Sequence, residues 1–231
     1  MEHYFTNKTN ITGNELIITG RESHHLTNVL RKKVGDELLV TDGERNLYKA
    51  KIIFIDKENI KCRIEEKSYN VNEPERNIHL YLALLKNPSR FEFAIEKCVE
   101  IGVNEITPII TEHVVNKKSD KLERWQSISL AAMKQSQRCY LPKINQPITF
   151  IDAVQNRKSV INFLADERAD CRTNFSLSAV DISLFIGPEG GFSNEEVELA
   201  KQNNFAIISL GKRKLRSETA AIVGISKLLV I

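Results

Sequence analysis

The sequence lacks the features that mark secreted, membrane-spanning and metal-binding proteins. Its four cysteines, Cys62, Cys98, Cys139 and Cys171, lie far apart and form no CxxC pair. This spacing favours buried, reduced thiols over a zinc site or a disulfide scaffold. No apolar run approaches the length of a membrane span, and the opening MEHYFTNKTN is too polar for a signal peptide. We therefore expect a cytoplasmic protein without a membrane partner and without a metal.

The chain also carries little net charge, only +3 over 231 residues. Total charge therefore gives no argument for nucleic-acid binding, and any such contact needs a local patch of basic residues. A hydrophobic content of 42% is enough for a sizeable core in one or two domains.

The character of the sequence changes near residue 72. Residues 1–72 contain short strand-like runs separated by turns such as Asp42-Gly43, and they predict a small β-barrel or curled sheet. One short helix is expected within HHLTNVLRKKVGD (24–36), with Gly35 at its end. The polar stretch 70–76 is a plausible linker.

Residues 73–231 alternate between strand-like and helix-like segments. A capping box from Ser89 to Glu92 predicts the start of a helix that Gly102 closes. Trp125 has the helical spacing of a core residue. The alternation predicts a largely parallel sheet in an α/β domain.

FIGPEGGFSNEEVELA (185–200) predicts a buried strand, a glycine-rich turn and a helix capped by Ser193 and Glu196. Ligands of parallel sheets bind at the carboxyl ends of strands. The turn has neither a P-loop nor a dinucleotide motif, and Glu189 would repel a phosphate. It therefore favours a neutral or cationic small molecule, although a tight turn with a solvated glutamate is an equally simple interpretation.

SLGKRKLRSETAA (209–221) repeats the passage from strand through glycine to helix. Four cations, Lys212, Arg213, Lys214 and Arg216, precede a final helix that is apolar on most sides. They indicate either a polyanion site beside the small-molecule site or solvated loop charges.

The two segments together strongly resemble the RsmE family of the SPOUT superfamily. Members of this family methylate N3 of a uridine in small-subunit ribosomal RNA. The similarity extends to HHLTNVLRKKVGD and VTDG, and to KCVEIGVNEITPI (97–109) and RWQSISLAAMKQSQR (124–138). One departure is Lys134, where an acidic residue is expected.

The resemblance implies a PUA-like β-domain over residues 1–72 and a SPOUT α/β domain over 73–231, with a C-terminal trefoil knot. It implies a homodimer that binds S-adenosylmethionine and acts on the 16S rRNA of the 30S subunit. The donor loops are Gly187–Gly191 and Leu210–Leu215, and the loop near Leu164 and Ala165 is a third candidate. The donor residues expected on this basis are Leu164, Gly187, Glu189, Gly190, Gly191, Leu210, Gly211 and Leu215.

The reaction requires removal of the N3 proton or stabilisation of the resulting anion. Arg216 lies beside a donor loop and is the expected electrostatic catalyst, whereas Glu218 is either a base or a partner that orients Arg216. Gln135, Arg138 and Lys86 are ambiguous between site and scaffold. RNA contacts are expected from Arg21, His24, Arg31, Lys32, Lys212 and Arg213, and His25 and Lys33 lie in the same N-terminal cluster.

Two other classes of function stay open. One is a non-catalytic rRNA-binding ribosome assembly factor that kept the fold, and donor binding distinguishes it from an enzyme. The other is a nucleotide-binding enzyme of the doubly wound type, which the absence of a phosphate motif argues against.

Overall fold

The computed structural model describes residues 3–115, 121–157, 159–169 and 181–230, so Cys171 lies outside the described residues. It divides into two units. The first comprises Met1–Glu73 and Met133–Leu141, and the second comprises Pro74–Ala132 and Pro142–Ile231. The sequence predicts one break near residue 72, whereas residues 133–141 also belong to the unit that contains the N-terminal part.

The first unit is built on a six-stranded sheet with the strand order β1-β4-β5-β6-β3-β2. Strand β1 runs parallel to β4, and the other neighbours are antiparallel. Apolar side chains alternate along its strands: Leu16 and Ile18 of β3 are fully buried, whereas Ile17 between them is 38% exposed. The strands are β1 (His3–Phe5), β2 (Ile11–Thr12), β3 (Glu15–Thr19), β4 (Glu37–Thr41), β5 (Asn46–Ile55) and β6 (Asn59–Tyr69).

A short 3-10 turn, η1 (Lys8–Asn10), precedes β2, and one helical segment follows β3. That segment is α1 (Gly20–His24), which continues as a single π-helical turn, η2 (His25–Val29). The helix thus begins earlier than expected, and the prediction that Gly35 ends it was wrong. Arg31 already takes a left-handed conformation (φ 54°) two residues after Val29, so the chain leaves the helix there. Gly35 lies in the turn before β4 and donates its N–H to the carbonyl of Ile52.

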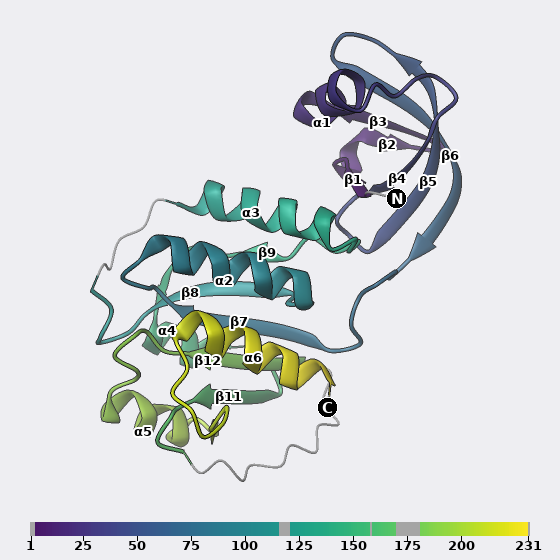
Figure 1. Ribbon diagram of the computed structural model, residues 1–231. Helices are drawn as coiled ribbons and strands as arrows, with labels where there is room; N and C mark the ends of the chain where they lie inside the picture. Colours follow the sequence, from purple (N-terminus) through teal and green to yellow (C-terminus); the bar gives the residue numbers. More distant parts are fainter. Residues whose placement is uncertain (1–2, 116–120, 158, 170–180, 231) are drawn as a thin grey trace. The chain divides into compact units, whose positions relative to one another are not determined.

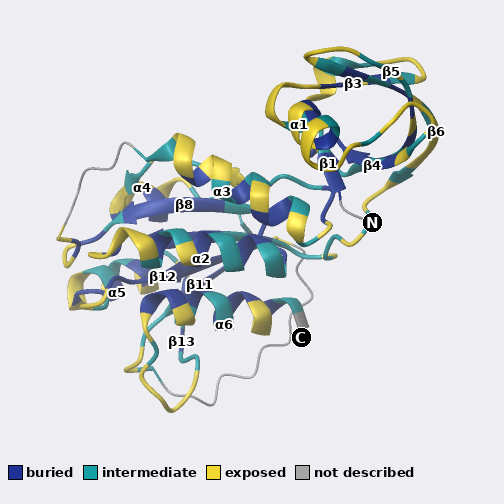
Figure 2. Ribbon diagram, turned by 45° about the horizontal axis from the view of Figure 1, so that its top comes forward, coloured by how far each residue is buried: buried dark blue, intermediate teal, exposed yellow. Residues whose placement is uncertain are grey.

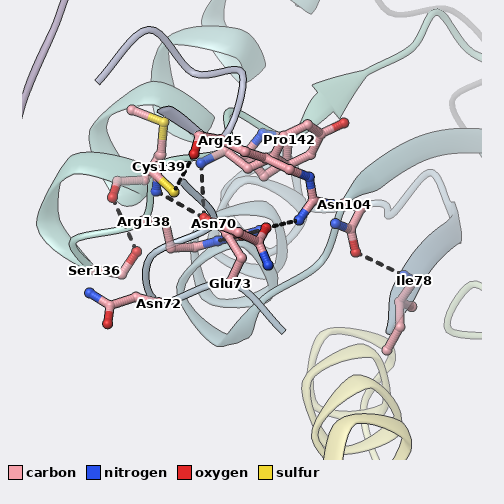
Figure 3. Close-up of polar contacts among 12 residues, drawn as sticks. Arg45, Asn70, Asn72, Glu73, Ile78, Asn104, Ser136, Arg138, Cys139 and Pro142 are labelled. Atoms are coloured by element: carbon pink, nitrogen blue, oxygen red, sulfur yellow. Dashed lines mark hydrogen bonds and ion pairs between the residues drawn. The ribbon is translucent and has the colours of Figure 1, made fainter. Parts of the chain in front are cut away.

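A buried ion pair fixes residues 133–141 within the first unit (Figure 3). Arg138 donates from Nη2 and Nε to Glu73 Oε2 at 2.6 and 3.1 Å. The other carboxylate oxygen accepts the backbone N–H groups of Cys139 and Tyr140, both at 2.9 Å. The two side chains are only 3% and 0% exposed. Arg138 is thus a scaffold residue of this unit.

Lys134, the departure noted in the sequence, also has a partner in the first unit. Its Nζ lies 3.0 and 2.7 Å from the two carboxylate oxygens of Glu22 in α1. Glu22 in addition accepts the backbone N–H of Phe5 at 3.1 Å. The helix that carries Arg21 and His24 is therefore anchored to β1 and to the 133–141 segment.

The second unit is an α/β domain whose seven-stranded sheet has the order β10-β8-β7-β12-β11-β13, with β9 beside β8. Within the described residues, all strand pairs of this sheet are parallel, as expected. Its strands are β7 (Asn77–Ala83), β8 (Glu105–Ile110), β9 (Lys143–Ile144), β10 (Ile148–Thr149), β11 (Ile161–Ala165), β12 (Asp181–Ile186) and β13 (Ala206–Ile208).

The helices of the second unit lie along this sheet and are buried on their inner sides (Figures 1 and 2). Helices α2 and α6 lie side by side. A Cβ on Gly224 of α6 would be 2.6 Å from Leu184 Cδ2, so α6 packs closely on β12. The helices are α2 (Pro88–Ile101), α3 (Leu122–Gln135), α4 (Phe150–Gln155), α5 (Asn194–Gln202) and α6 (Ser217–Val230).

The predicted helix ends are partly confirmed. Gly102 closes α2 in a left-handed conformation, and Ser193 with Glu196 forms a complete capping box at α5. The Ser89–Glu92 box was wrong, because Asn87 is the N-cap of α2 and its side chain accepts the N–H of Ser89. Pro88 at the first helical position favours that earlier start. None of the described helices is both long and apolar enough to cross a membrane.

Candidate active site

A cavity of about 650 Å³ lies in the second unit, at the carboxyl edge of the parallel sheet. Residues that follow β8, β11, β12 and β13 line it, because the carboxyl ends of parallel strands meet at one edge. Its volume is in the range of small-molecule and cofactor sites. The two glycine-containing segments singled out in the sequence therefore share one cavity.

The glycine loop (residues 187–196) connects β12 to α5 and needs its small residues for close packing. A Cβ on Gly190 would lie 3.0 Å from His113 Cβ, and one on Gly187 would lie 3.2 Å from the Phe192 ring. Gly191 has a positive φ of 73° and open space at its Cβ position. A ligand can therefore approach this backbone without meeting a side chain at Gly191.

Glu189 stabilises the glycine loop through a contact far away in sequence. Its carboxylate oxygens accept the backbone N–H of Lys86, after β7, at 3.2 and 3.4 Å. The carboxylate thus connects the loop after β12 to the loop after β7.

The segment after β8 is connected to the glycine loop at two points. His113 Nδ1 lies 3.1 Å from the carbonyl oxygen of Gly191, which corresponds to a hydrogen bond when Nδ1 carries the proton. Glu196 accepts the N–H of Glu112 at 2.9 Å with one oxygen and the N–H of Ser193 at 3.0 Å with the other. One glutamate therefore completes the capping box and also fixes a neighbouring loop.

The segment after β11 contacts the glycine loop through Arg168. Its guanidinium binds both oxygens of Asp166 and also donates to Asn194 Oδ1 at 2.7 Å and to the Phe192 carbonyl at 3.1 Å. Burial raises the pKa of Asp166, but the hydrogen bonds and charge of Arg168 outweigh burial and leave the pKa below its ordinary value. Asp166 is therefore a carboxylate at neutral pH.

The basic loop (residues 210–216) has fewer contacts. Gly211 has a φ of 145° and open space around its Cβ position. Lys227 Nζ donates to the carbonyl of Leu210 at 3.0 Å, and Lys214 pairs with Glu167 at 2.9 Å. Arg216 lines the cavity, is exposed, and makes no side-chain hydrogen bond or ion pair with a residue that the structure describes. Its guanidinium is available to a substrate.

Most of the predicted site residues line the cavity. Leu164, Glu218 and Lys212 of the second unit do not, and neither do the candidates in the first unit. Leu164 is fully buried in β11, one residue before the lining residue Ala165. Glu218 is 10% exposed on its side chain and lies 3.7 Å from Arg90 of α2. Lys212 is exposed beside the cavity. The lining residues are Gly187, Glu189, Gly190, Gly191, Leu210, Gly211, Arg213, Leu215 and Arg216.

The remaining candidates form the basic patch of the first unit, defined as Arg21, His24, His25, Arg31, Lys32 and Lys33. All are exposed except Lys32, which is half-buried. Both histidines are therefore surface residues, and neither belongs to the core. The patch lies along α1 and η2 and the turn that follows them.

Two groups of lining residues were missed in the sequence: Glu112 with His113, and Asn194 with Glu195. The loop near Leu164 and Ala165 was a candidate, and its lining residues are Ala165–Arg168. Glu112 and His113 follow a strand end, in PIITEH, and that position was the available signal. Side-chain contacts between distant loops have no local sequence pattern.

The cavity suits a small cationic or zwitterionic molecule. Glycine backbone with open space lines it, and so do side chains of both signs, carboxylates as well as lysine and arginine. Within the described residues, no group of three or more His, Cys, Asp or Glu side chains could hold a metal ion.

Comparison with known proteins agrees with this geometry. A family model described as an RNA methyltransferase domain matches residues 72–229, and one described as an RNA methyltransferase PUA domain matches residues 18–65. Ribosomal RNA small subunit methyltransferase E of Mesomycoplasma hyopneumoniae is 37% identical over 98% of either chain.

Two solved structures are similar over the whole chain. The ribosomal RNA small subunit methyltransferase E of Neisseria gonorrhoeae, bound to S-adenosyl methionine, has a TM-score of 0.89 at 27% identity, covering 100% of this chain and 97% of its own. A methyltransferase of Legionella pneumophila with bound SAM has a TM-score of 0.87 at 30% identity, covering 99% and 96%.

The fold and the cavity thus define an RNA methyltransferase with a PUA domain. The chain belongs to the RsmE family, whose curated members are named ribosomal RNA small subunit methyltransferase E. The resemblance stated from the two loops is confirmed, and the doubly wound nucleotide-binding enzyme is not supported.

Proposed function

We propose that this protein transfers a methyl group from S-adenosylmethionine to N3 of a uridine in the 16S rRNA of the small ribosomal subunit. The observation that carries the proposal is the convergence of the glycine loop and the basic loop on one cavity of about 650 Å³. Two structural relatives bind S-adenosylmethionine, and the curated relatives are named for small-subunit ribosomal RNA.

The donor residues in this proposal are Gly187, Glu189, Gly190, Gly191, Leu210, Gly211 and Leu215, with Leu164 supporting them from β11. When bound, the donor supplies an electrophilic methyl group on a sulfonium centre. The backbone at Gly191 and Gly211 is open for close approach. Carboxylates at the rim are compatible with a cationic donor, although they would repel a phosphate.

Arg216 is proposed to stabilise the uridine anion that forms when N3 loses its proton. The residue sits at the rim of the cavity, just before α6, and its guanidinium has no competing side-chain partner among the described residues. A cation beside developing negative charge stabilises the transition state. Glu218 is the proposed proton acceptor; its ion pair is with Arg90 and not with Arg216, which argues against the alternative that it orients Arg216 by a salt bridge.

RNA is proposed to contact both units. Arg21, His24, Arg31 and Lys32 of the basic patch and Lys212 and Arg213 of the basic loop are the proposed phosphate ligands. Exposed lysine and arginine side chains bind RNA phosphates with little dependence on sequence. The edge of the uridine base that carries N3 is proposed to lie in the cavity.

The proposal also includes a PUA-like β-barrel domain over residues 1–72 and a SPOUT α/β domain over residues 73–231 with a C-terminal trefoil knot. The active form is proposed to be a homodimer. The dimer is supported by α6, on which the apolar side chains Ile222, Val223 and Leu229 are only half-buried in the single chain. A second copy would cover them. The substrate places the enzyme in the cytoplasm.

Nucleoside mass spectrometry of 16S rRNA tests the activity. We expect N3-methyluridine to disappear from a strain without this gene and to return with the wild-type gene but not with Arg216→Ala. An unchanged nucleoside profile in the deletion strain would overturn the proposal. Wild-type protein that restores growth or ribosome assembly without binding S-adenosylmethionine would favour the non-catalytic assembly factor.

A further inference from the structure

Arg168 connects two walls of the cavity. Through Asp166 it belongs to the segment after β11, and through Phe192 and Asn194 it reaches the glycine loop. Asp166 also donates its backbone N–H to the carbonyl of Ile208, the last residue of β13, at 2.9 Å. The Arg168 guanidinium therefore links the segment after β11 directly to the segment after β12. Through Asp166 it is also linked to the end of β13.

All three nitrogens of the Arg168 guanidinium donate hydrogen bonds. Nε lies 2.9 and 3.1 Å from the two oxygens of Asp166, and Nη2 lies 2.6 Å from Oδ2. Nη1 and Nη2 then have the Asn194 side chain and the Phe192 carbonyl within reach. Asp166 is 6% exposed on its side chain and Arg168 is 52% exposed, so the fork is held from its buried side. An ammonium group has no comparable planar array of donors.

We propose that Arg168 is a positioning residue that holds the glycine loop in its donor-binding arrangement before the donor arrives. The inference rests on the proposed function, because it assigns a role in donor binding. Asp166, Arg168, Phe192 and Asn194 all line the cavity, so a shift of this linkage changes the shape of the site itself. A loop that is ordered in advance loses less conformational freedom on binding.

The chain offers a matched control. Arg124 of α3 makes the same kind of fork with Glu92 of α2, through Nε at 2.8 Å and Nη2 at 2.6 Å. That pair joins two helices of the same unit, and neither residue lines the cavity. Removing either arginine should have a similar small effect on global stability, since both are more than half exposed.

The test compares wild type, Arg168→Gln, Arg168→Lys and Arg124→Gln by calorimetric titration with S-adenosylmethionine and by hydrogen exchange of the ligand-free protein. In Arg168→Gln we expect the donor Kd to rise about tenfold, with kcat at saturating donor within about twofold of wild type. Exchange of residues 187–196 should be faster by at least about threefold. Arg168→Lys should also have a higher donor Kd and faster exchange than wild type. Arg124→Gln should match wild type in both donor Kd and exchange rate.

The outcomes separate this inference from the proposed function. If wild type binds no donor, the proposed function fails, and the exchange rates of the ligand-free protein alone decide whether Arg168 orders the loop. If wild type binds donor, a wild-type Kd or wild-type exchange in Arg168→Gln overturns the inference. Full restoration by Arg168→Lys would also overturn it, because charge alone would then suffice.

Discussion

The glycine loop and the basic loop line the same cavity but are held in opposite ways. The glycine loop is fixed from three sides, by Lys86 after β7, Glu112 and His113 after β8, and Arg168 after β11. In the basic loop, Leu210 accepts a hydrogen bond from Lys227 and Lys214 pairs with Glu167, whereas Arg213 and Arg216 are exposed cations.

This difference indicates a division of roles. A preformed backbone surface suits a small donor that every reaction cycle uses in the same way. Exposed arginine and lysine side chains suit a large anionic substrate, because they adapt to phosphates at low cost and attract RNA over a distance. We therefore expect changes in the glycine loop to affect donor affinity, and changes in the basic loop to affect RNA binding and catalysis.

The largest effect is expected from Gly190→Val. Its Cβ would stand 3.0 Å from His113 Cβ and 3.3 Å from His113 Cγ, and the added methyl groups would displace the loop. Calorimetry should show loss of donor binding by about a hundredfold or more, with a melting temperature close to that of wild type. A donor Kd equal to that of wild type would show that the glycine loop is not part of the donor site.

Arg216→Ala should separate catalysis from donor binding. We expect turnover on small ribosomal subunits to fall about a hundredfold, because one transition-state contact is lost, and the donor Kd to stay within about threefold. Lys212→Ala is the control in the same loop, since Lys212 is exposed and does not line the cavity. Its turnover at saturating RNA should equal that of wild type. A fully active Arg216→Ala would limit Arg216 to a structural or RNA contact.

The basic patch extends the comparison to the first unit. Changing Arg31 and Lys32 together to alanine should weaken RNA binding about tenfold at low salt and reduce its salt slope by about 1 to 2. Donor affinity should not change. Filter-binding titrations at several salt concentrations measure the slope, and a slope identical to that of wild type would exclude both side chains as phosphate ligands.

The smallest effect is expected at Glu189. Glu189→Ala removes the acceptor for the Lys86 N–H and should raise the donor Kd about fivefold. Glu189→Gln keeps an oxygen acceptor without the charge and should stay close to wild type. If Gln weakens binding as much as Ala, the charge of Glu189 acts on the donor directly and the loop contact is secondary.

The shared cavity of the two glycine segments could be predicted from the sequence, because the order of strands and turns determines where the segments lie. Two glycine segments that follow buried strands of a parallel sheet must meet at one edge, and both line the cavity. The Ser193–Glu196 capping box has a local pattern and was confirmed. Local patterns also misled: Asn87-Pro88 starts α2 ahead of Ser89.

Contacts between segments that are far apart in the chain could not be predicted from the sequence. Glu189 and the Lys86 N–H are separated by 103 residues, and Lys134 and Glu22 by 112. The assignment of residues 133–141 to the first unit depends on the buried pair of Glu73 and Arg138, which are 65 residues apart. No periodicity or motif encodes such pairings, since they follow from how the complete chain folds.

One measurement tests the division of roles most directly: the salt dependence of both affinities of the wild-type protein, for S-adenosylmethionine and for small-subunit ribosomal RNA. The account predicts that RNA affinity falls steeply and linearly in a plot of log Kd against log salt, because several phosphate contacts release counterions. Donor affinity should change by less than about twofold over the same range. A donor affinity that falls in parallel with that of RNA, or an RNA affinity independent of salt, would contradict the account.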